Sequence, residues 1–302
     1  GKLASAVKAF REVYVAQPTA LADGRRVSEI EDLKDLAAMN VARIYFSLQR
    51  FENANNNYSL VQRDSAYWPE SLFESAWAYF HLQDLNTTLG LLLTVQSPYF
   101  AEDEFIPEVI LLRALTFFNL CEFNEVERLL LDFETKYKPM QAEMKSFLDK
   151  YKSDESRKLT DQAYDEYFQT AHGSSTLHKS LFLKILRNRD LSALVSHMDT
   201  MDEELVEIDS QRGSWTTTVG EALKGVIAND RSRYKRRAGI VLLREMHEEY
   251  TALADLIVQS EIVRFEVVDA QRVDYEFKMQ NPDVDAVAEK PVDFANSREV
   301  IY

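Results

Sequence analysis

The sequence predicts an all-α protein: a solenoid of helical hairpins followed by a long, coiled-coil-like helical arm. Eight glycines and seven prolines in 302 residues leave the chain poor in the residues that favour tight turns. A pattern of small and aromatic residues recurs about every 34 residues in the first half, which is typical of helical repeats. In the second half no proline occurs between Trp215 and Lys278, and apolar residues recur at steps of three and four, as on one face of a helix.

Composition excludes several classes of partner. With 35 Lys and Arg against 50 Asp and Glu, the formal net charge of −15 disfavours nucleic-acid binding, which depends on neutralising phosphates. The longest uncharged run, Leu85 to Ala101, contains Gly90, Pro98 and several polar residues, so we expect no integral membrane span. The single cysteine, Cys121, excludes a disulfide framework.

Three segments of the first half, residues 40–61, 74–95 and 112–133, align with one another. The positions that recur are a small and an aromatic residue in the first helix, the residue after the turn, and three positions of the second helix: Ala42, Tyr45, Phe51, Ala54, Tyr58 and Val61; Ala76, Tyr79, Leu85, Thr88, Leu92 and Val95; Ala114, Phe117, Phe123, Val126, Leu130 and Phe133. The spacing is 34 residues from Phe46 to Phe80 and 38 from Phe80 to Phe118, with the extra residues in the loop before the third segment.

This pattern resembles the tetratricopeptide repeat family. The period, the small–aromatic pair and the A-x3-aromatic step match, whereas Thr88 and Val126 replace the usual alanine, and the usual tryptophan and leucine are largely missing. Residues 6–18 resemble the second helix of an incomplete first repeat, so we expect the natural protein to extend upstream. Pro139 is expected to close the third repeat, so that the repeat domain covers residues 1–139.

The remainder is expected to form a helical connector at 140–187, a long helical hairpin or arm at 188–279 and an extended tail at 280–302. A break is predicted at His172–Ser175, where glycine and serines follow the histidine. The apolar stripe of the long helix drifts, which argues against a strict heptad seam. A single helix of about 60 residues is expected here, unless Gly239 introduces a kink.

Two stretches, WTTTVGEALK at 215–224 and RFEVVDAQR at 264–272, resemble the C-terminal region of certain tetratricopeptide proteins of predatory and gliding deltaproteobacteria. The resemblance implies a bacterial, non-enzymatic protein in the periplasm or associated with the cell envelope; a cytoplasmic location is the alternative. More sequence usually follows in such proteins, so we expect the chain to be truncated at both ends.

No motif predicts catalysis, and we expect neither enzyme activity nor a cofactor or metal. The five histidines lack ligand spacing such as H-E-x-x-H. His172 and His178 flank a loop without a nearby cysteine or paired carboxylate, so we interpret them as solvated. Cys121 lies in a turn without a positioned base, and we expect a half-buried structural thiol.

The first helix of each repeat is expected to line a concave groove, as the family resemblance implies. The expected groove residues are Leu36, Met39, Arg43 and Phe46; Glu70, Phe73, Trp77 and Phe80; and Glu108, Leu111, Leu115 and Phe118. Most of them are apolar, which suits an amphipathic helix or an extended hydrophobic peptide of a protein partner. The alternative is that the groove is filled by residues 140–187 or by the arm, because a large exposed aromatic patch is a liability.

Five basic residues lie within seven positions of this acidic chain: Arg231, Arg233, Lys235, Arg236 and Arg237. One interpretation is a patch for an anionic partner. The other is a solvated helix face whose charges pair with local acids.

The function that these observations predict is a non-catalytic interaction scaffold of a bacterial envelope or motility-type assembly, which binds a peptide or helix in its groove. The alternative is a structural module that forms homo-oligomers through its helical arm and fills the groove with its own chain.

Overall fold

The computed structural model describes residues 2–15, 24–101, 104–151, 158–172, 179–211, 213 and 219–281. All regular secondary structure in this part of the chain is helical, which confirms the all-α class. The helices, in chain order, are α1 (Lys2–Val15), α2 (Gly24–Ser47), α3 (Phe51–Tyr58), α4 (Trp68–His81), α5 (Leu85–Val95), α6 (Pro98–Ala101), α7 (Glu108–Asn119), α8 (Phe123–Tyr151), α9 (Lys158–His172), α10 (Lys179–Leu186), α11 (Arg189–Ser210) and α12 (Val219–Gln280). The expected break at 173–175 and the tail from 282 onwards lie outside the described residues.

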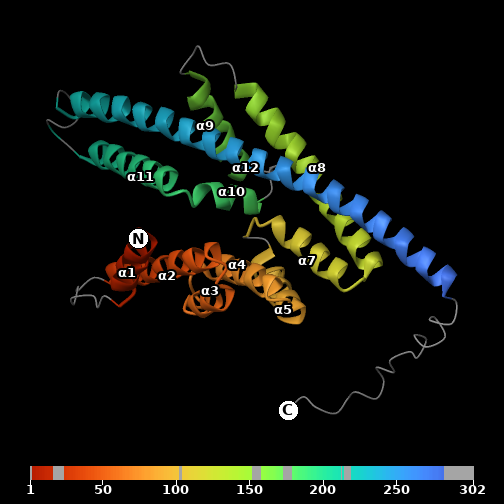
Figure 1. Cartoon of the computed structure of the whole chain (residues 1–302). Helices are drawn as coiled ribbons and strands as arrows, with labels where there is room; N and C mark the ends of the chain where they lie inside the picture. Colours follow the sequence, from red (N-terminus) through yellow and green to blue (C-terminus); the bar gives the residue numbers. More distant parts are fainter. Residues whose placement is uncertain are drawn as a thin grey trace.

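Neighbouring helices of the first half pack as hairpins (Figure 1). α2 packs on α3, α4 on α5 and α7 on α8, and the hairpins contact one another through α3 with α4 and α5 with α7. α1 lies against α2. In the second half α12 runs alongside α11 and then alongside α8, and α9 packs against it as well (Figure 1).

The three hairpins turn in the same way. Two positions after the first helix of each, a residue lies in the left-handed backbone region: Gln49 (φ 56°), Gln83 (φ 62°) and Cys121 (φ 59°). In each turn the following residue donates its N–H to a carbonyl five positions back, as Arg50 does to Tyr45 at 2.9 Å. This is the Schellman arrangement, which ends a helix while pairing its last carbonyl groups. It occurs here without glycine, although a left-handed residue with a side chain costs roughly 1–2 kcal/mol.

The positions that recur in the sequence form the interior of the hairpins. The small residues Ala42, Ala76 and Ala114 are completely buried. All nine recurring positions of the second helices are buried too: Ala54, Tyr58 and Val61; Thr88, Leu92 and Val95; Val126, Leu130 and Phe133. Thr88 satisfies its buried hydroxyl by donating to the Asp84 carbonyl at 2.8 Å. The sequence periodicity therefore identified the buried face correctly.

The expectation that Pro139 closes the third repeat is wrong, because α8 continues through it to Tyr151. A proline inside a helix costs about 3 kcal/mol relative to alanine. The buried side chains of Tyr137, Met140 and Met144 lie on either side of it. Burial of a large apolar side chain stabilises by about 1.5–3 kcal/mol, so three of them outweigh the proline. The second helix of the third hairpin therefore has 29 residues against 12 in the first.

α12 is one helix of 62 residues, about 93 Å long at 1.5 Å per residue. The helix is continuous through Gly239. The missing side chain of this glycine allows α9 to approach the backbone of α12 closely. A Cβ atom at this position would lie 2.1 Å from the backbone oxygen of Thr160, so α9 touches the backbone of α12 here. Among the described helices we find none with the length and apolar character needed to cross a bilayer.

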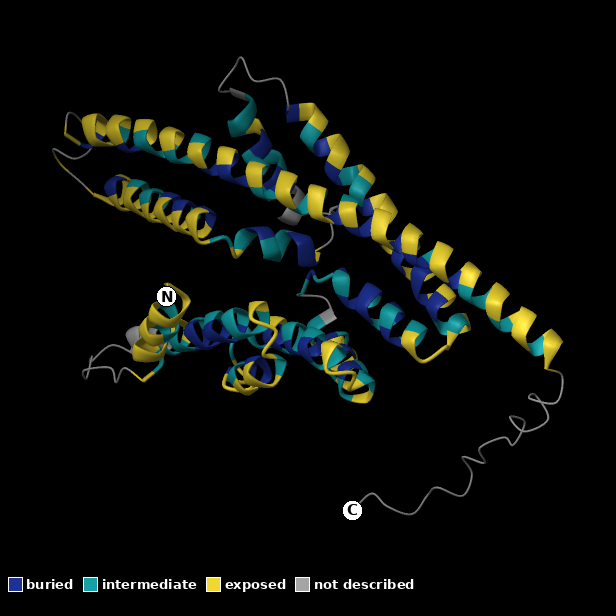
Figure 2. Cartoon of the chain, in the orientation of Figure 1, coloured by how far each residue is buried: buried dark blue, intermediate teal, exposed yellow. Residues whose placement is uncertain are grey.

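One continuous core joins α7 to α12. Its buried members include Leu111 of α7, Phe133 of α8, Tyr167 of α9, Leu191 of α11 and Leu242 of α12. The regions expected to be a connector and an arm thus share their core with the third hairpin. Figure 2 shows that α12 is buried on the side that faces the other helices and exposed on its outer side. Only its C-terminal turns extend past α8 (Figure 1).

We expect Gly239→Ala to lower the free energy of unfolding by about 1–3 kcal/mol, because the added methyl group overpacks the contact with Thr160. Urea unfolding measures the change. Gly225→Ala in the same helix is the matched control, because no atom lies within 4 Å of the added Cβ. We expect that control to gain about 0.5–1 kcal/mol from helix propensity. Equal effects of the two variants would contradict the close approach of α9 and α12.

Candidate functional site: the inner surface of α2 and α4

The structure divides the expected groove residues into two groups. Leu111 is buried in the main core, and Leu115 and Phe118 pack against that core, while α7 packs on α12. Of the third set, only Leu111 is fully buried; Leu115 and Phe118 are half-buried, and Glu108 lines a second pocket described below. Met39 is also completely buried, beside Val61. The other expected groove residues of α2 and α4 are half-buried or exposed: Leu36, Arg43, Phe46, Glu70, Phe73, Trp77 and Phe80.

A pocket of about 470 Å³ opens on the inner surface of α2 and α4. Its lining consists of Arg43, Phe46, Tyr58, Glu74, Trp77 and His81. Three of these were predicted from the sequence, whereas Tyr58, Glu74 and His81 were not. Tyr58 was assigned to the core of α3, and Glu74 and His81 lie one position beyond predicted groove residues. Ligand pockets in proteins span about 300–1,000 Å³, so this one is large enough for a bulky side chain of a partner.

The imidazole ring of His81 contacts several aromatic side chains at the rim of the pocket. Its ring stacks on Phe51 with centroids 4.6 Å apart and an angle of 7° between the planes. Phe46 meets the same imidazole edge-on at 5.6 Å, and Trp77 lies 6.2 Å away. Such ring pairs contribute about 0.5–1.5 kcal/mol beyond their buried area. The apolar walls are therefore preorganised by contacts between α2, α3 and α4.

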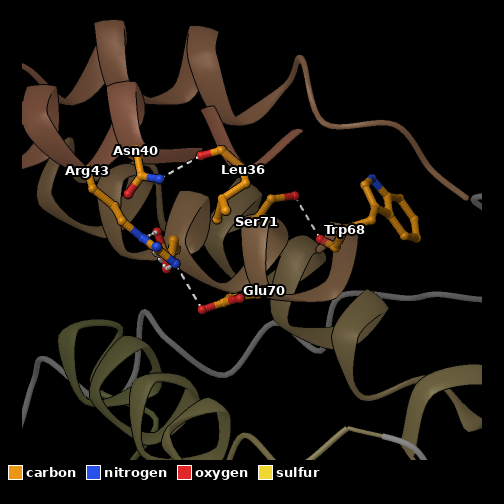
Figure 3. A network of polar contacts seen from close by, with 7 residues as sticks. Leu36, Asn40, Arg43, Trp68, Glu70 and Ser71 are labelled. Carbon is orange, nitrogen blue, oxygen red and sulfur yellow. Dashed lines mark hydrogen bonds and ion pairs between the residues drawn. The ribbon is translucent and has the colours of Figure 1, made fainter. Parts of the chain in front are cut away.

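Arg43 crosses from α2 to two carboxylates of α4 (Figure 3). Its Nε donates to Glu74 Oε2 at 2.9 Å and to Oε1 at 3.0 Å, and its Nη2 donates to Glu70 Oε1 at 2.9 Å. Burial raises the pKa of the Tyr58 phenol above its ordinary value, and the Glu74 carboxylate adds to the shift. The guanidinium and Glu74 thus neutralise each other at the wall of the pocket.

A second pocket of about 400 Å³ adjoins the first and shares Glu74 with it. Glu70 and Phe73 of α4, Glu108 of α7, Lys184 of α10 and Arg187 directly after α10 contribute to its lining. Arg187 donates two hydrogen bonds to the Glu104 carboxylate, at 2.7 and 2.8 Å. The inner surface therefore continues from an aromatic pocket into a charged one that α10 borders.

The basic residues of α12 are mostly paired within the protein. Arg231 binds both oxygens of Asp202 on α11 at 2.6 and 2.7 Å, and Lys235 binds Asp165 on α9 at 2.6 Å. Arg233 pairs with Asp230 at 3.3 Å on its own helix. The remaining two, Arg236 and Arg237, are respectively half-buried and exposed. These contacts favour the interpretation of local pairing over an anionic-partner patch.

The remaining candidates from the sequence are metal-ligating groups, Cys121 and two histidines. Within the described ranges we find no group of three or more His, Cys, Asp or Glu residues able to hold a metal. Cys121 is exposed rather than half-buried, since the left-handed turn directs it to solvent. The side chains of His172 and His178 lie outside the described part. No protein-family model matches the chain, and no curated protein matches its sequence.

Replacing Arg43 with lysine is expected to lower the free energy of unfolding by about 1–2 kcal/mol, because lysine loses the bidentate contact with Glu74. Thermal or urea unfolding measures the loss. Arg233→Lys is the matched control: its partner is exposed, so the change is expected to stay within about 0.5 kcal/mol. Equal losses in both variants would show that Arg43 does not link α2 to α4.

The pKa of Glu70 is raised above its ordinary value of 4.5, because partial burial removes water and Glu74 adds repulsion that Arg43 only partly offsets. The folded state thus binds this proton more tightly than the unfolded state. We expect wild type to lose stability relative to Glu70→Gln as the pH rises from about 4.5 towards neutrality. Unfolding curves across that range measure the difference. Glu125→Gln should show little slope there and the opposite slope below about pH 4.5, since Arg128 lowers the pKa of Glu125.

Proposed function

We propose that this chain is a non-catalytic scaffold of tetratricopeptide-type repeats that binds a peptide or helix of another protein on the inner surface of α2 and α4. The observation that carries the proposal is the aromatic pocket of about 470 Å³. The three hairpins with similar turns, and buried residues at twelve of the eighteen recurring positions, support the repeat assignment. Binding sites of this kind recognise an amphipathic partner through a few of its apolar side chains.

The chemistry of the two pockets defines the partner further. Phe46 and Trp77 favour a large apolar anchor, since each presents a half-buried ring to the pocket. Leu111 of the third hairpin is unavailable to a partner because it lies in the main core, whereas Glu108 of the same helix lines the second pocket. The bound segment therefore lies along α2 and α4 and reaches the border that α10 and Glu108 form. Its apolar anchor sits in the pocket of the first two hairpins.

A location in a bacterial envelope or motility-type assembly forms part of the same proposal. It is supported by the resemblance of residues 215–224 and 264–272 to proteins of predatory and gliding deltaproteobacteria, and by no contact in the structure. Binding at the pocket does not depend on this location. The two parts are therefore tested separately.

A random peptide library displayed on phage tests the binding site, with the intact chain as bait. We expect it to yield peptides with a bulky apolar residue that bind at least tenfold more weakly to Trp77→Ala, since a central aromatic anchor contributes about 2 kcal/mol or more. Because Trp77 also packs against the neighbouring core, His81→Ala at the exposed rim serves as a second variant. Affinity is measured by fluorescence anisotropy.

Leu131→Ala is the matched control for this experiment, because Leu131 is exposed on α8, away from the pocket. Peptides should bind this variant as they bind wild type. A library that yields no peptide sensitive to Trp77 or His81, with both variants shown to be folded, would overturn the proposed function.

A further inference from the structure

The outer face of α12 carries an uncovered apolar stripe near its C-terminal end. Val258, Ile262, Phe265 and Val268 are 56%, 53%, 77% and 58% exposed. They are spaced by four, three and three residues, which places them on one side of the helix. Val273, Tyr275, Phe277 and Met279 extend the exposed apolar surface to the end of the helix. We name Val258, Ile262, Phe265 and Val268 the outer stripe.

The outer stripe lies opposite the face that holds α12 in the fold. On the inner face Ser260, Val263 and Val267 are buried. Ion pairs to α8 join Arg264 to Glu134 at 3.0 Å and Glu261 to Lys138 at 3.6 Å. The stripe thus contributes nothing to the described core. A run of exposed apolar residues on a face rimmed by charge is typical of a surface that meets another protein.

The charged residues around the outer stripe indicate which kind of partner can bind there. Five acidic residues lie among or beside the apolar positions: Asp255, Glu261, Glu266, Asp269 and Glu276. Two basic residues neutralise part of this acid: Arg272 pairs with Asp269 at 2.8 Å and with Glu276 at 3.4 Å, and Lys138 of α8 pairs with Glu261 at 3.6 Å. A face with this excess of acid favours a basic partner, because opposite charges attract across an interface and like charges repel.

The same charges disfavour the other occupants. A second copy of α12 would bring the same acidic rim against this one. Residues 282–302 of this chain contain five acidic and two basic side chains, so they match the face no better. An anionic lipid surface is repelled as well. A second α12, residues 282–302 and an anionic lipid surface are all negatively charged, as this face of α12 is.

We propose that the outer stripe of α12 docks a basic amphipathic helix of another protein. The partner helix places apolar side chains at steps of four and three residues against Ile262 and Phe265. Its Lys or Arg residues flank that stripe and meet Asp255 and Glu266, for which no ion pair within the chain is described. This surface is separate from the pocket on α2 and α4, and the two inferences do not depend on each other.

Photo-crosslinking with the intact protein tests the proposal in the cells that produce it. Benzoylphenylalanine replaces Phe265, whose side chain is largely exposed, so that folding is preserved. The same probe at Leu131 on α8 is the control for nonspecific crosslinking. Mass spectrometry of the adduct identifies the crosslinked segment. We expect a segment with apolar residues at helical spacing flanked by Lys and Arg, formed at position 265 and not at 131.

Charge reversal provides the second measurement. Asp255→Lys with Glu266→Lys is expected to reduce the adduct yield at least fivefold. Glu203→Lys with Glu204→Lys on α11 changes the net charge equally at exposed positions and should leave the yield unchanged. An adduct with a second copy, with residues 282–302 of the same chain or with an acidic or uncharged segment would overturn the proposal. The same holds for an absence of adduct at position 265, or for equal effects of the two charge reversals.

Discussion

The burial of one face of α12 is the constraint on which the rest of the second half depends. Leu242, Met246 and Leu253 of this helix form one core together with apolar side chains of α9, α10 and α11. Ion pairs from Arg231 to α11 and from Lys235 to α9 add fixed contacts around that core. Gly239 sets the distance to α9, because its missing side chain allows the two backbones to touch. Burial supplies the driving force, and the ion pairs and the glycine define the geometry.

The same packing determines where a binding surface remains. α12 packs on the third hairpin, where Leu111 is core and Leu115 and Phe118 pack against that core. The first two hairpins have no such cover, and their aromatic residues stay half-buried around a pocket. Arg43 pairs with both Glu74 and Glu70, so each of these carboxylates has a positive charge beside it. Helix packing in one half of the chain thereby selects the accessible surface in the other half.

Sequence reasoning predicted part of the candidate site. Arg43, Phe46 and Trp77, chosen because residues four and three apart share one face of a helix, line the pocket. Tyr58 and His81 were missed for different reasons. Tyr58 belongs to another helix and reaches the pocket from the core of its own hairpin, whereas His81 joins through ring stacking that no spacing reveals. The five basic residues of α12 allowed two interpretations, and their acid partners lie mainly on other helices.

By itself the sequence determined the all-α class, the three hairpins and their buried positions, and the long final helix. These features follow from local periodicity, since each helix must bury one face whatever covers it. Only the tertiary structure decided that α8 continues through Pro139, that Leu111 lies in the core and that Gly239 marks a contact rather than a kink. Each of those outcomes depends on which distant helix packs against the residue. A one-dimensional pattern records that a face is apolar, but not what lies against it.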